Sequence, residues 1–112
     1  MIVKAVQLAA AALAAAAALH KAPAAAQDVK AGQRKAIACQ ACHGMDGLSR
    51  LPDAPNIAGH PARYLERTLR AFRSGERKNE MMSVAARTLT DEDIRDLAAY
   101  YSAIKVEAKV PE

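Results

Sequence analysis

Five consecutive residues, Cys39-Gln40-Ala41-Cys42-His43, carry the clearest chemical signal in the sequence. They form a C-x-x-C-H motif, and Cys39 and Cys42 are the only two cysteines of the chain. Two thiols at this spacing can each bind one vinyl group of the same porphyrin, while the next histidine turns its imidazole toward the iron. The motif therefore predicts one covalently attached haem c, held by Cys39 and Cys42, with His43 as an iron ligand.

Three other interpretations of the motif explain the sequence less well. A structural zinc site normally needs four cysteine or histidine ligands, and after residue 26 the chain offers only His60 beyond the motif. A thioredoxin-like dithiol is expected in a βαβ context, but no alternating strand pattern is present. A plain disulfide suits an oxidising compartment, yet it gives no reason for the adjacent histidine.

The imidazole of His43 should have a hydrogen-bond partner on its other side. A ligating histidine usually donates its second ring N–H to an oxygen, which fixes the ring and tunes its basicity. The carbonyl oxygen of Pro55, in the segment that follows the motif, is the predicted acceptor. Pro52 is the competing choice.

A second axial ligand must come from elsewhere in the chain. Met81 and Met82 are adjacent thioether donors, and a soft thioether favours ferrous iron and raises the potential. Met45 is too close to His43 in sequence to reach the opposite face of a haem. His60 would give a bis-histidine site, but an exposed polar residue is the commoner meaning of a histidine just before a helix. These residues leave the choice between Met81 and Met82 open.

The N-terminal residues 1–26 have the features of a secretory signal peptide. Lys4 supplies the basic start, an apolar run follows from Ala5 to Leu19, and Ala24-Ala25-Ala26 gives a small-residue cleavage site. The run is shorter than the roughly 20 apolar residues that span a bilayer. We therefore expect export to the periplasm, no membrane span after cleavage, and a mature domain over residues 27–112.

The mature domain is small and nearly neutral. Loss of Lys4 and Lys21 with the signal would lower the formal net charge from +4 to +2, and the whole chain has no Trp and one Phe. A domain of this size has a marginal core of its own, so a buried porphyrin would supply apolar surface that side chains do not. The charge gives no indication of a nucleic-acid partner.

The pattern after residue 26 predicts an all-α fold with three main helices. The first runs from about Val29 to Ala41 and ends at Gly44, because glycine is the usual residue just past a helix end. The second begins at Pro61 and continues to about Ser74. The third starts at Thr90, an N-cap with Asp93 in a capping-box arrangement, and ends near Lys105. Residues 44–59 and 76–89 are predicted to be irregular, and the long first loop suits the edge of a haem.

The second predicted helix has two different sides. Its apolar side, expected to face the core, consists of Tyr64, Leu65, Leu69 and Phe72, and its basic side of Arg63, Arg67, Arg70 and Arg73. A solvated face is the commoner meaning of such a basic stripe. A docking surface for a partner protein is the alternative.

These features together resemble the class I cytochrome c family, in particular its short monohaem bacterial periplasmic members, over essentially all of residues 27–112. The matching residues are Gly32, Cys39-Gln40-Ala41-Cys42-His43-Gly44, Asp46-Gly47, Pro55-Asn56-Ile57-Ala58-Gly59, Tyr64-Leu65, Phe72-Arg73-Ser74-Gly75, Arg77, Asn79, Met82, Ala86, Leu89-Thr90-Asp91 and Leu97-Ala98-Ala99-Tyr100.

The resemblance implies a small cytochrome c fold, with long loops wrapped around one haem c, and a specific set of contacts. It implies axial ligation by His43 and Met82, with the Pro55 carbonyl as the partner of His43, and Tyr100 packed where the first and last helices cross at Gly32. Met82 is selected because three residues separate the family's ligand methionine from the alanine that matches Ala86, and at that register Met81 is the second choice. The chain departs from its relatives at His60, where glutamine is frequent, and at Glu80-Met81, in place of residues such as Pro-Val.

The sequence thus predicts a periplasmic monohaem carrier of single electrons and not an enzyme, since no catalytic constellation is visible. Its expected partners are periplasmic redox proteins such as a dehydrogenase, a membrane cytochrome complex or a terminal oxidase. Two alternatives are a fixed cytochrome subunit of a periplasmic dehydrogenase and a haem-based ligand-binding or sensor protein.

Overall fold

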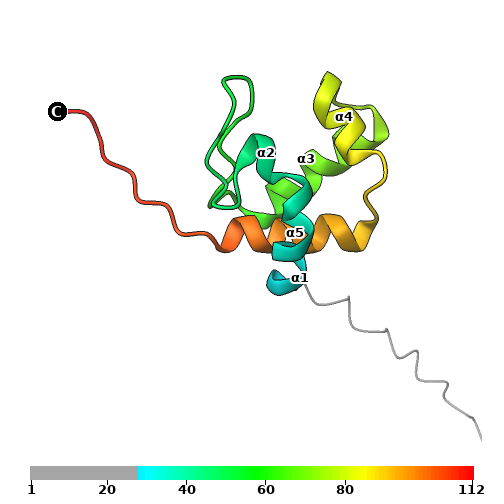
Figure 1. Ribbon diagram of the computed structural model, residues 1–112, viewed down its shortest axis with the longest axis horizontal. Coiled ribbons are helices and arrows are strands. Elements are labelled where there is room, and N and C mark those ends of the chain that lie inside the picture. The colour runs from blue at the N-terminus through cyan, green and yellow to red at the C-terminus, as the bar shows by residue number, and fades with distance from the viewer. Residues whose placement is uncertain (1–27) are drawn as a thin grey trace, which may run out of the picture.

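A computed structural model of the protein describes residues 28–112, and in this part of the chain all regular secondary structure is helical. In chain order the elements are α1 (Val29–Lys35), the 3-10 helix η1 (Ala36–Ala38), α2 (Gln40–His43), α3 (Ala62–Ser74), α4 (Glu80–Ala86) and α5 (Asp91–Ala103). The all-α fold class is therefore confirmed (Figure 1). The predicted signal peptide, residues 1–26, lies outside the described residues.

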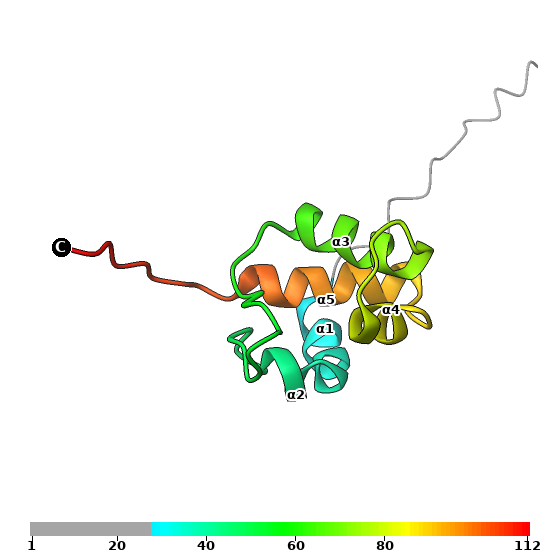
Figure 2. The same ribbon diagram turned by 90° about the horizontal axis from the view of Figure 1, so that it is seen from above.

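Helix α5 is the central element of the fold. Figure 2 shows α3 along one side of α5, with α1 and α2 on the other side. Helix α4 packs against α3 and stands with it at one end of α5. The core lies where these helices meet, and it contains Ala36, Leu65, Leu97, Ala98 and Tyr101.

The crossing of α1 and α5 requires a glycine. A Cβ atom built on Gly32 would lie 1.9 Å from the carbonyl oxygen of Asp96 and 2.7 Å from the Cβ of Tyr100. Any side chain at this position would therefore force the two helices apart. The contact of Tyr100 with the helix crossing, which the family resemblance implied, is present.

A charged cluster joins the same two helices. The Nζ atom of Lys35 lies 2.6 Å from Oδ2 of Asp96 and 3.0 Å from Oδ1 of Asp93. Asp96 is only 3% exposed, and its Oδ1 also accepts the backbone N–H of Asp28 at 3.1 Å. The hydrogen bond from Lys35 lowers the pKa of Asp96, and the hydrogen bonds to Asp96 and Asp93 raise the pKa of Lys35.

This cluster makes stability depend on pH in a predictable direction. A carboxylate whose pKa is lowered on folding stabilises the fold above its unfolded pKa, about 3.9 for an aspartate, and this contribution is lost as the pH falls through the lowered value. Asp96→Asn should therefore destabilise the holoprotein at pH 7 by about 1.5–3 kcal/mol, the usual scale for a hydrogen bond to a charged group. The deficit should shrink in strongly acidic buffer.

The test is urea unfolding of wild type and Asp96→Asn across pH 2–7. Glu92→Gln is a matched control, because Glu92 is an exposed carboxylate of the same helix, and its effect should stay within a few tenths of a kcal/mol. A deficit of Asp96→Asn that is as large at pH 2 as at pH 7 would contradict the electrostatic explanation.

The helix starts follow local hydrogen bonding. Thr90 and Asp93 form the predicted capping box of α5: the Thr90 hydroxyl accepts the N–H of Asp93 at 3.1 Å, and the Asp93 carboxylate accepts the N–H of Thr90 at 2.9 Å. Gly44 and Gly75 end α2 and α3 with positive φ values of 72° and 83°. These ends agree with the sequence.

Two details of the predicted secondary structure are wrong. The segment 76–89 is not entirely irregular, because Glu80–Ala86 forms α4. The cause is an N-cap: the side-chain oxygen of Asn79 accepts the N–H groups of Met81 and Met82 at 3.1 and 2.9 Å. The single helix predicted from Val29 to Ala41 is instead divided into α1, η1 and α2.

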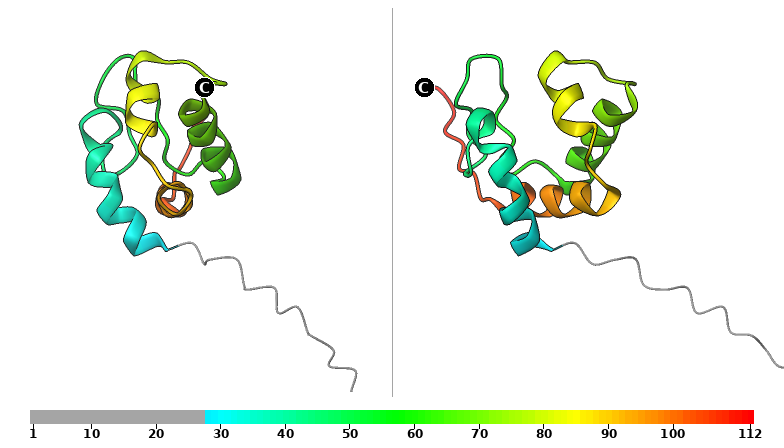
Figure 3. Two further views of the ribbon diagram at one scale, coloured as in Figure 1. Left: turned by 90° about the vertical axis from the view of Figure 1, so that its right-hand side faces the viewer. Right: turned by 45° about the vertical axis from the view of Figure 1, so that its right-hand side comes forward.

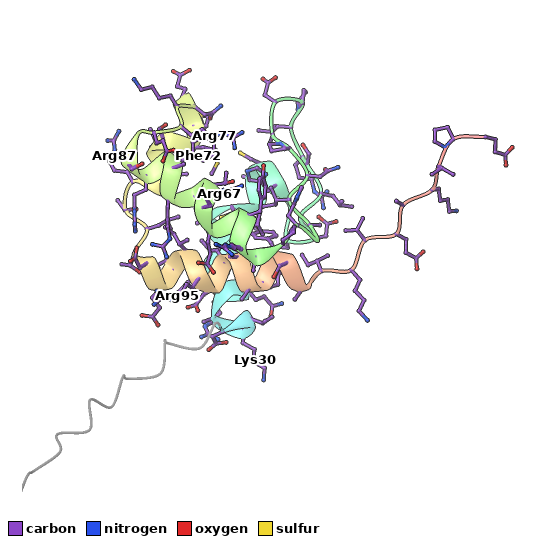
Figure 4. All side chains as sticks on the ribbon, turned by 180° about the vertical axis from the view of Figure 1, so that it is seen from behind. Lys30, Arg67, Phe72, Arg77, Arg87 and Arg95 are labelled. Carbon is purple, nitrogen blue, oxygen red and sulfur yellow. The ribbon has the colours of Figure 1, made fainter. Side chains whose placement is uncertain are left out.

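Helix α3 buries only part of its predicted apolar side. Leu65 and Phe72 are 7% and 8% exposed, whereas Tyr64 is 40% exposed beside the ring of His60, at 5.4 Å between centroids. Tyr64 therefore does not face the core as expected. The guanidinium of Arg77 lies 4.8 Å from the centroid of Phe72 and covers that ring, as Figure 4 shows from behind.

The basic side of α3 is divided between two roles. Arg70 and Arg73 approach Oδ1 of Asp91 at 2.5 and 2.7 Å and so connect α3 to the start of α5. These two guanidinium groups, that of Arg73 above all, lower the pKa of Asp91. Arg63 and Arg67 are exposed. Two of the four arginines on this side of α3 therefore hold helices together, and the other two face the solvent.

Candidate haem-binding site

The motif residues are placed by η1 and α2. Cys39 lies between these two short helices, and His43 is the last residue of α2 before the turn at Gly44. Both thiols are free and half-buried. Burial raises the pKa of the Cys39 thiol, so this cysteine lacks the low pKa that makes a redox-active dithiol nucleophilic.

The zinc and dithiol alternatives gain no support from the structure. Within residues 28–112 no group of three or more His, Cys, Asp or Glu side chains could hold a metal ion. The same part of the chain has no strand from which a βαβ unit could be built. The haem interpretation uses both thiols and the histidine without needing a further cysteine or histidine ligand.

His43 is buried, with 7% of its surface exposed, and its ring is oriented by one hydrogen bond. Nδ1 lies 2.9 Å from the carbonyl oxygen of Pro55, and not against the competing Pro52. A carbonyl oxygen can only accept, so Nδ1 must carry the proton and donate it. Nε2 has no hydrogen-bond partner among the described residues, and in this tautomer it presents a lone pair suited to a metal.

The loop after the motif holds Pro55 in position. The carbonyl oxygen of Gly47 accepts the N–H groups of Ile57 and Ala58, at 2.8 and 3.1 Å. Gly47 is buried with a φ of 71°, and a Cβ atom there would lie 2.7 Å from the backbone of Ala58. The backbone around Gly47 and the backbone around Ala58 are therefore in close contact. These hydrogen bonds hold the part of the loop that carries the Pro55 carbonyl.

The two candidate methionines are differently exposed on α4. Met81 is 69% exposed, whereas Met82 is half-buried. Figure 3 shows α4 facing α2 and its loop across the top of α5. The other candidates lie elsewhere: Met45 packs against the core cluster, and His60 is exposed beside Tyr64.

The residues present fit a haem. The site supplies two free thiols, an imidazole whose Nδ1 is bound to the Pro55 carbonyl, and a half-buried thioether on the facing helix. The side chains alone form a small core, since Ile94 is the one large side chain that is fully buried in residues 28–112. Large apolar side chains on the elements around the site stay exposed, among them Ile37 at 61%, Leu51 at 49% and Val84 at 61%. An apolar macrocycle is the kind of body that such a core lacks.

Sequence reasoning assigned no site role to Tyr101. Its hydroxyl donates to the carbonyl oxygen of Gly44 at 3.2 Å, directly after His43. Burial raises the pKa of Tyr101 far above its ordinary value, so the hydroxyl remains a donor at all physiological pH values. The sequence indicated only that Tyr101 belongs to the apolar stripe of α5, because no pattern reports where a buried hydroxyl will find its acceptor.

Comparisons with known proteins also support a haem site. A model of the cytochrome c family matches residues 29–104. Cytochrome c-554(548) of Halomonas halodenitrificans is 47% identical over 78 residues, which cover 67% of this chain and 94% of that protein. A thiosulfate dehydrogenase electron acceptor of Thiomonas intermedia is 42% identical over 77 residues, which cover 67% of this chain and 35% of that protein.

A solved structure extends the likeness to three dimensions. Reduced recombinant cytochrome c4 from Pseudomonas stutzeri superposes with a TM-score of 0.66 at 39% identity, over 71% of this chain and 47% of that one. The chain thus spans nearly the whole of one relative, but less than half of the cytochrome c4 chain and of the thiosulfate dehydrogenase acceptor.

Proposed function

The chain belongs to the cytochrome c family, and from this membership we propose that it is a periplasmic electron carrier whose haem iron is held by His43 and Met82. That it is an electron carrier with one covalently attached haem c, and not an enzyme, follows from the family and the C-x-x-C-H motif. The axial ligands, the location and the partners are the proposal. The observation that carries it is the hydrogen bond from Nδ1 of His43 to the Pro55 carbonyl.

That hydrogen bond determines what His43 can do. It fixes the tautomer, orients the ring and makes Nε2 a better electron donor. Cys39 and Cys42, on the same turn of chain, would hold the group covalently at a fixed distance from the imidazole. A haem held in this way supplies reversible one-electron iron chemistry. The protein residues supply the ligands, the apolar cover and the orientation.

Met82 is preferred to Met81 as the second ligand. Its side chain is half-buried, whereas Met81 is 69% exposed. The Asn79 side chain accepts the N–H groups of both residues and so fixes the backbone at the start of α4. Adjacent residues of a helix lie about 100° apart, and the lower exposure of Met82 supports this residue as the proposed ligand.

The periplasmic location rests on the sequence of residues 1–26 and on the bacterial relatives. No helix within residues 28–112 is long and apolar enough to cross a membrane. One relative is named as the electron acceptor of thiosulfate dehydrogenase, and for this chain we propose a periplasmic dehydrogenase as the donor. A membrane cytochrome complex or a terminal oxidase would be the acceptor.

A fixed subunit of a dehydrogenase complex is the second candidate function, and the arginine side of α3 is the observation that favours it. Arg63 and Arg67 are exposed there, and a permanent partner with an acidic surface would fit them. Arg70 and Arg73 are already paired with Asp91, which leaves a small surface for docking. A free carrier is therefore the preferred proposal.

Purification from the periplasm of the native bacterium tests the proposal. We expect a protein whose mass equals residues 27–112 plus one haem, that elutes alone in gel filtration and titrates reversibly as a single one-electron couple. A stoichiometric dehydrogenase that co-elutes would support the fixed-subunit alternative. An intact Met1 in the membrane fraction would contradict the proposed location, and ferrous haem that binds carbon monoxide readily would favour a ligand-binding protein.

A further inference from the structure

Tyr101 makes hydrogen bonds to two places in the chain: the peptide that directly follows His43, and the end of the loop that carries Pro55. Its side chain is 3% exposed, and its hydroxyl donates to the carbonyl oxygen of Gly44 at 3.2 Å. Its backbone carbonyl oxygen accepts the N–H of Gly59 at 2.9 Å. Gly44 directly follows His43, and Gly59 ends the loop that carries Pro55. One residue of α5 therefore contacts the donor side and the acceptor side of the same hydrogen bond.

The neighbouring tyrosine has a different position. The hydroxyl of Tyr100 donates to the carbonyl oxygen of Met45 at 2.6 Å, two residues after His43. Among the described residues, no hydrogen bond links Tyr100 to the loop segment that carries Pro55. The two rings are in edge contact at 5.1 Å. Tyr100 thus binds only the chain that follows His43, whereas Tyr101 binds that chain and also the end of the loop that carries Pro55.

We propose that Tyr101 is a positioning residue that sets the strength of the His43 to Pro55 hydrogen bond and thereby the reduction potential of the carrier. The inference rests on the proposed ligation by His43. The phenol holds the peptide after His43 while the carbonyl of the same residue holds the loop, so the two partners keep a fixed separation of 2.9 Å.

The direction of the effect follows from the chemistry of imidazole. A strong Nδ1–H to carbonyl bond increases the basicity of the ligand and favours the ferric state. If the donor segment gains freedom, this hydrogen bond weakens on average and the imidazole donates less charge. The ferrous state is then favoured, and the potential rises.

Tyr101→Phe in the holoprotein tests the proposal, because it removes the hydroxyl and keeps the ring and the bond to Gly59. The exchange rate of the His43 Nδ1 proton, measured by NMR in the diamagnetic ferrous state, should increase roughly two- to tenfold, the range expected for one ordinary hydrogen bond. The reduction potential should rise in the same variant. A change confined to thermal stability would overturn the proposal, since a purely structural hydroxyl alters neither exchange at His43 nor the potential.

Two control variants isolate the contribution of Tyr101. Ser102→Ala removes a hydroxyl that donates to Ala99 within the same helix, at 3.1 Å, and should change neither measurement. Tyr100→Phe should change both less than Tyr101→Phe does. An effect of Tyr100→Phe that equals or exceeds that of Tyr101→Phe would show that contact with both segments is not the cause.

A second modification covers the case in which Tyr101→Phe fails to hold haem. Incorporation of 3-fluorotyrosine at position 101 keeps the ring and the hydroxyl and makes the hydroxyl a stronger donor, so proton exchange should slow and the potential should fall. Faster exchange with this analogue would overturn the proposal. The same measurement on the wild type distinguishes failure of the His43 ligand assignment from failure of the role proposed for Tyr101. Absence of a protected Nδ1 proton in the wild type would refute the ligand assignment. An exchange rate and a potential that do not change in Tyr101→Phe would refute only the role of Tyr101.

Discussion

Replacement of both motif cysteines, Cys39→Ser with Cys42→Ser, should release the haem and leave a largely unfolded chain. Wild-type haem should stay with the protein through acid and acetone extraction, because thioether bonds survive conditions that break ligand bonds. In the double variant the haem should pass into the solvent. The mass of the denatured polypeptide should fall by that of one haem.

Loss of the fold is expected because the side chains alone form a weak core. Ile94 is the one large side chain that is fully buried in residues 28–112, and several large apolar residues around the site are exposed. Small domains of this kind depend on an additional apolar body for stability. Circular dichroism should therefore show a loss of most of the helical signal in the double variant.

The single variants are the matched controls for this prediction. Cys39→Ser and Cys42→Ser each keep one thiol, so each should retain one thioether and resist extraction, with a lower yield of holoprotein. Haem that extracts from the wild type, or a mass that corresponds to two haems, would contradict the attachment hypothesis.

The fold could be predicted in outline because its signals are local. Helix ends at Gly44 and Gly75 and the Thr90 capping box each depend on residues within one turn, and all are present in the structure. Gly32 is a signal of another kind, since its absent side chain leaves room for Asp96 and Tyr100. The family resemblance identified that crossing, whereas helix periodicity alone does not distinguish it.

The parts that the sequence did not reveal depend on contacts between distant residues. Tyr64 belongs to the apolar side of α3 by periodicity, yet its ring is exposed beside the ring of His60 and not part of the core. Arg70 and Arg73 have the pattern of a solvated face, but Asp91 lies within reach once α5 packs against α3. Helix α4 is different, because its Asn79 cap is a local contact; the sequence does not indicate it, since the helix is short and follows Arg77 and Lys78 without apolar periodicity.

Met82→Ala should abolish the weak near-infrared absorption of the ferric protein and lower its reduction potential. That band arises from charge transfer between a thioether sulfur and ferric iron, so it reports the methionine ligand directly. A soft thioether stabilises ferrous iron, and its loss should cost a substantial part of the roughly 0.8 V range over which axial ligands set haem potentials. Met81→Ala should keep the band, because Met81 is 69% exposed while Met82 is half-buried.

The adjacency of the two methionines requires the double variant as a control. Rescue of Met82→Ala by Met81 would need α4 to turn by about 100°, and the Asn79 side chain opposes this because it binds the N–H groups of both residues. We therefore expect Met82→Ala and the double variant to have the same spectrum. A band that survives Met82→Ala and disappears in Met81→Ala would move the ligand by one residue. A wild type without the band, whose ferric spectrum changes in His60→Ala, would indicate bis-histidine ligation and a carrier of low potential.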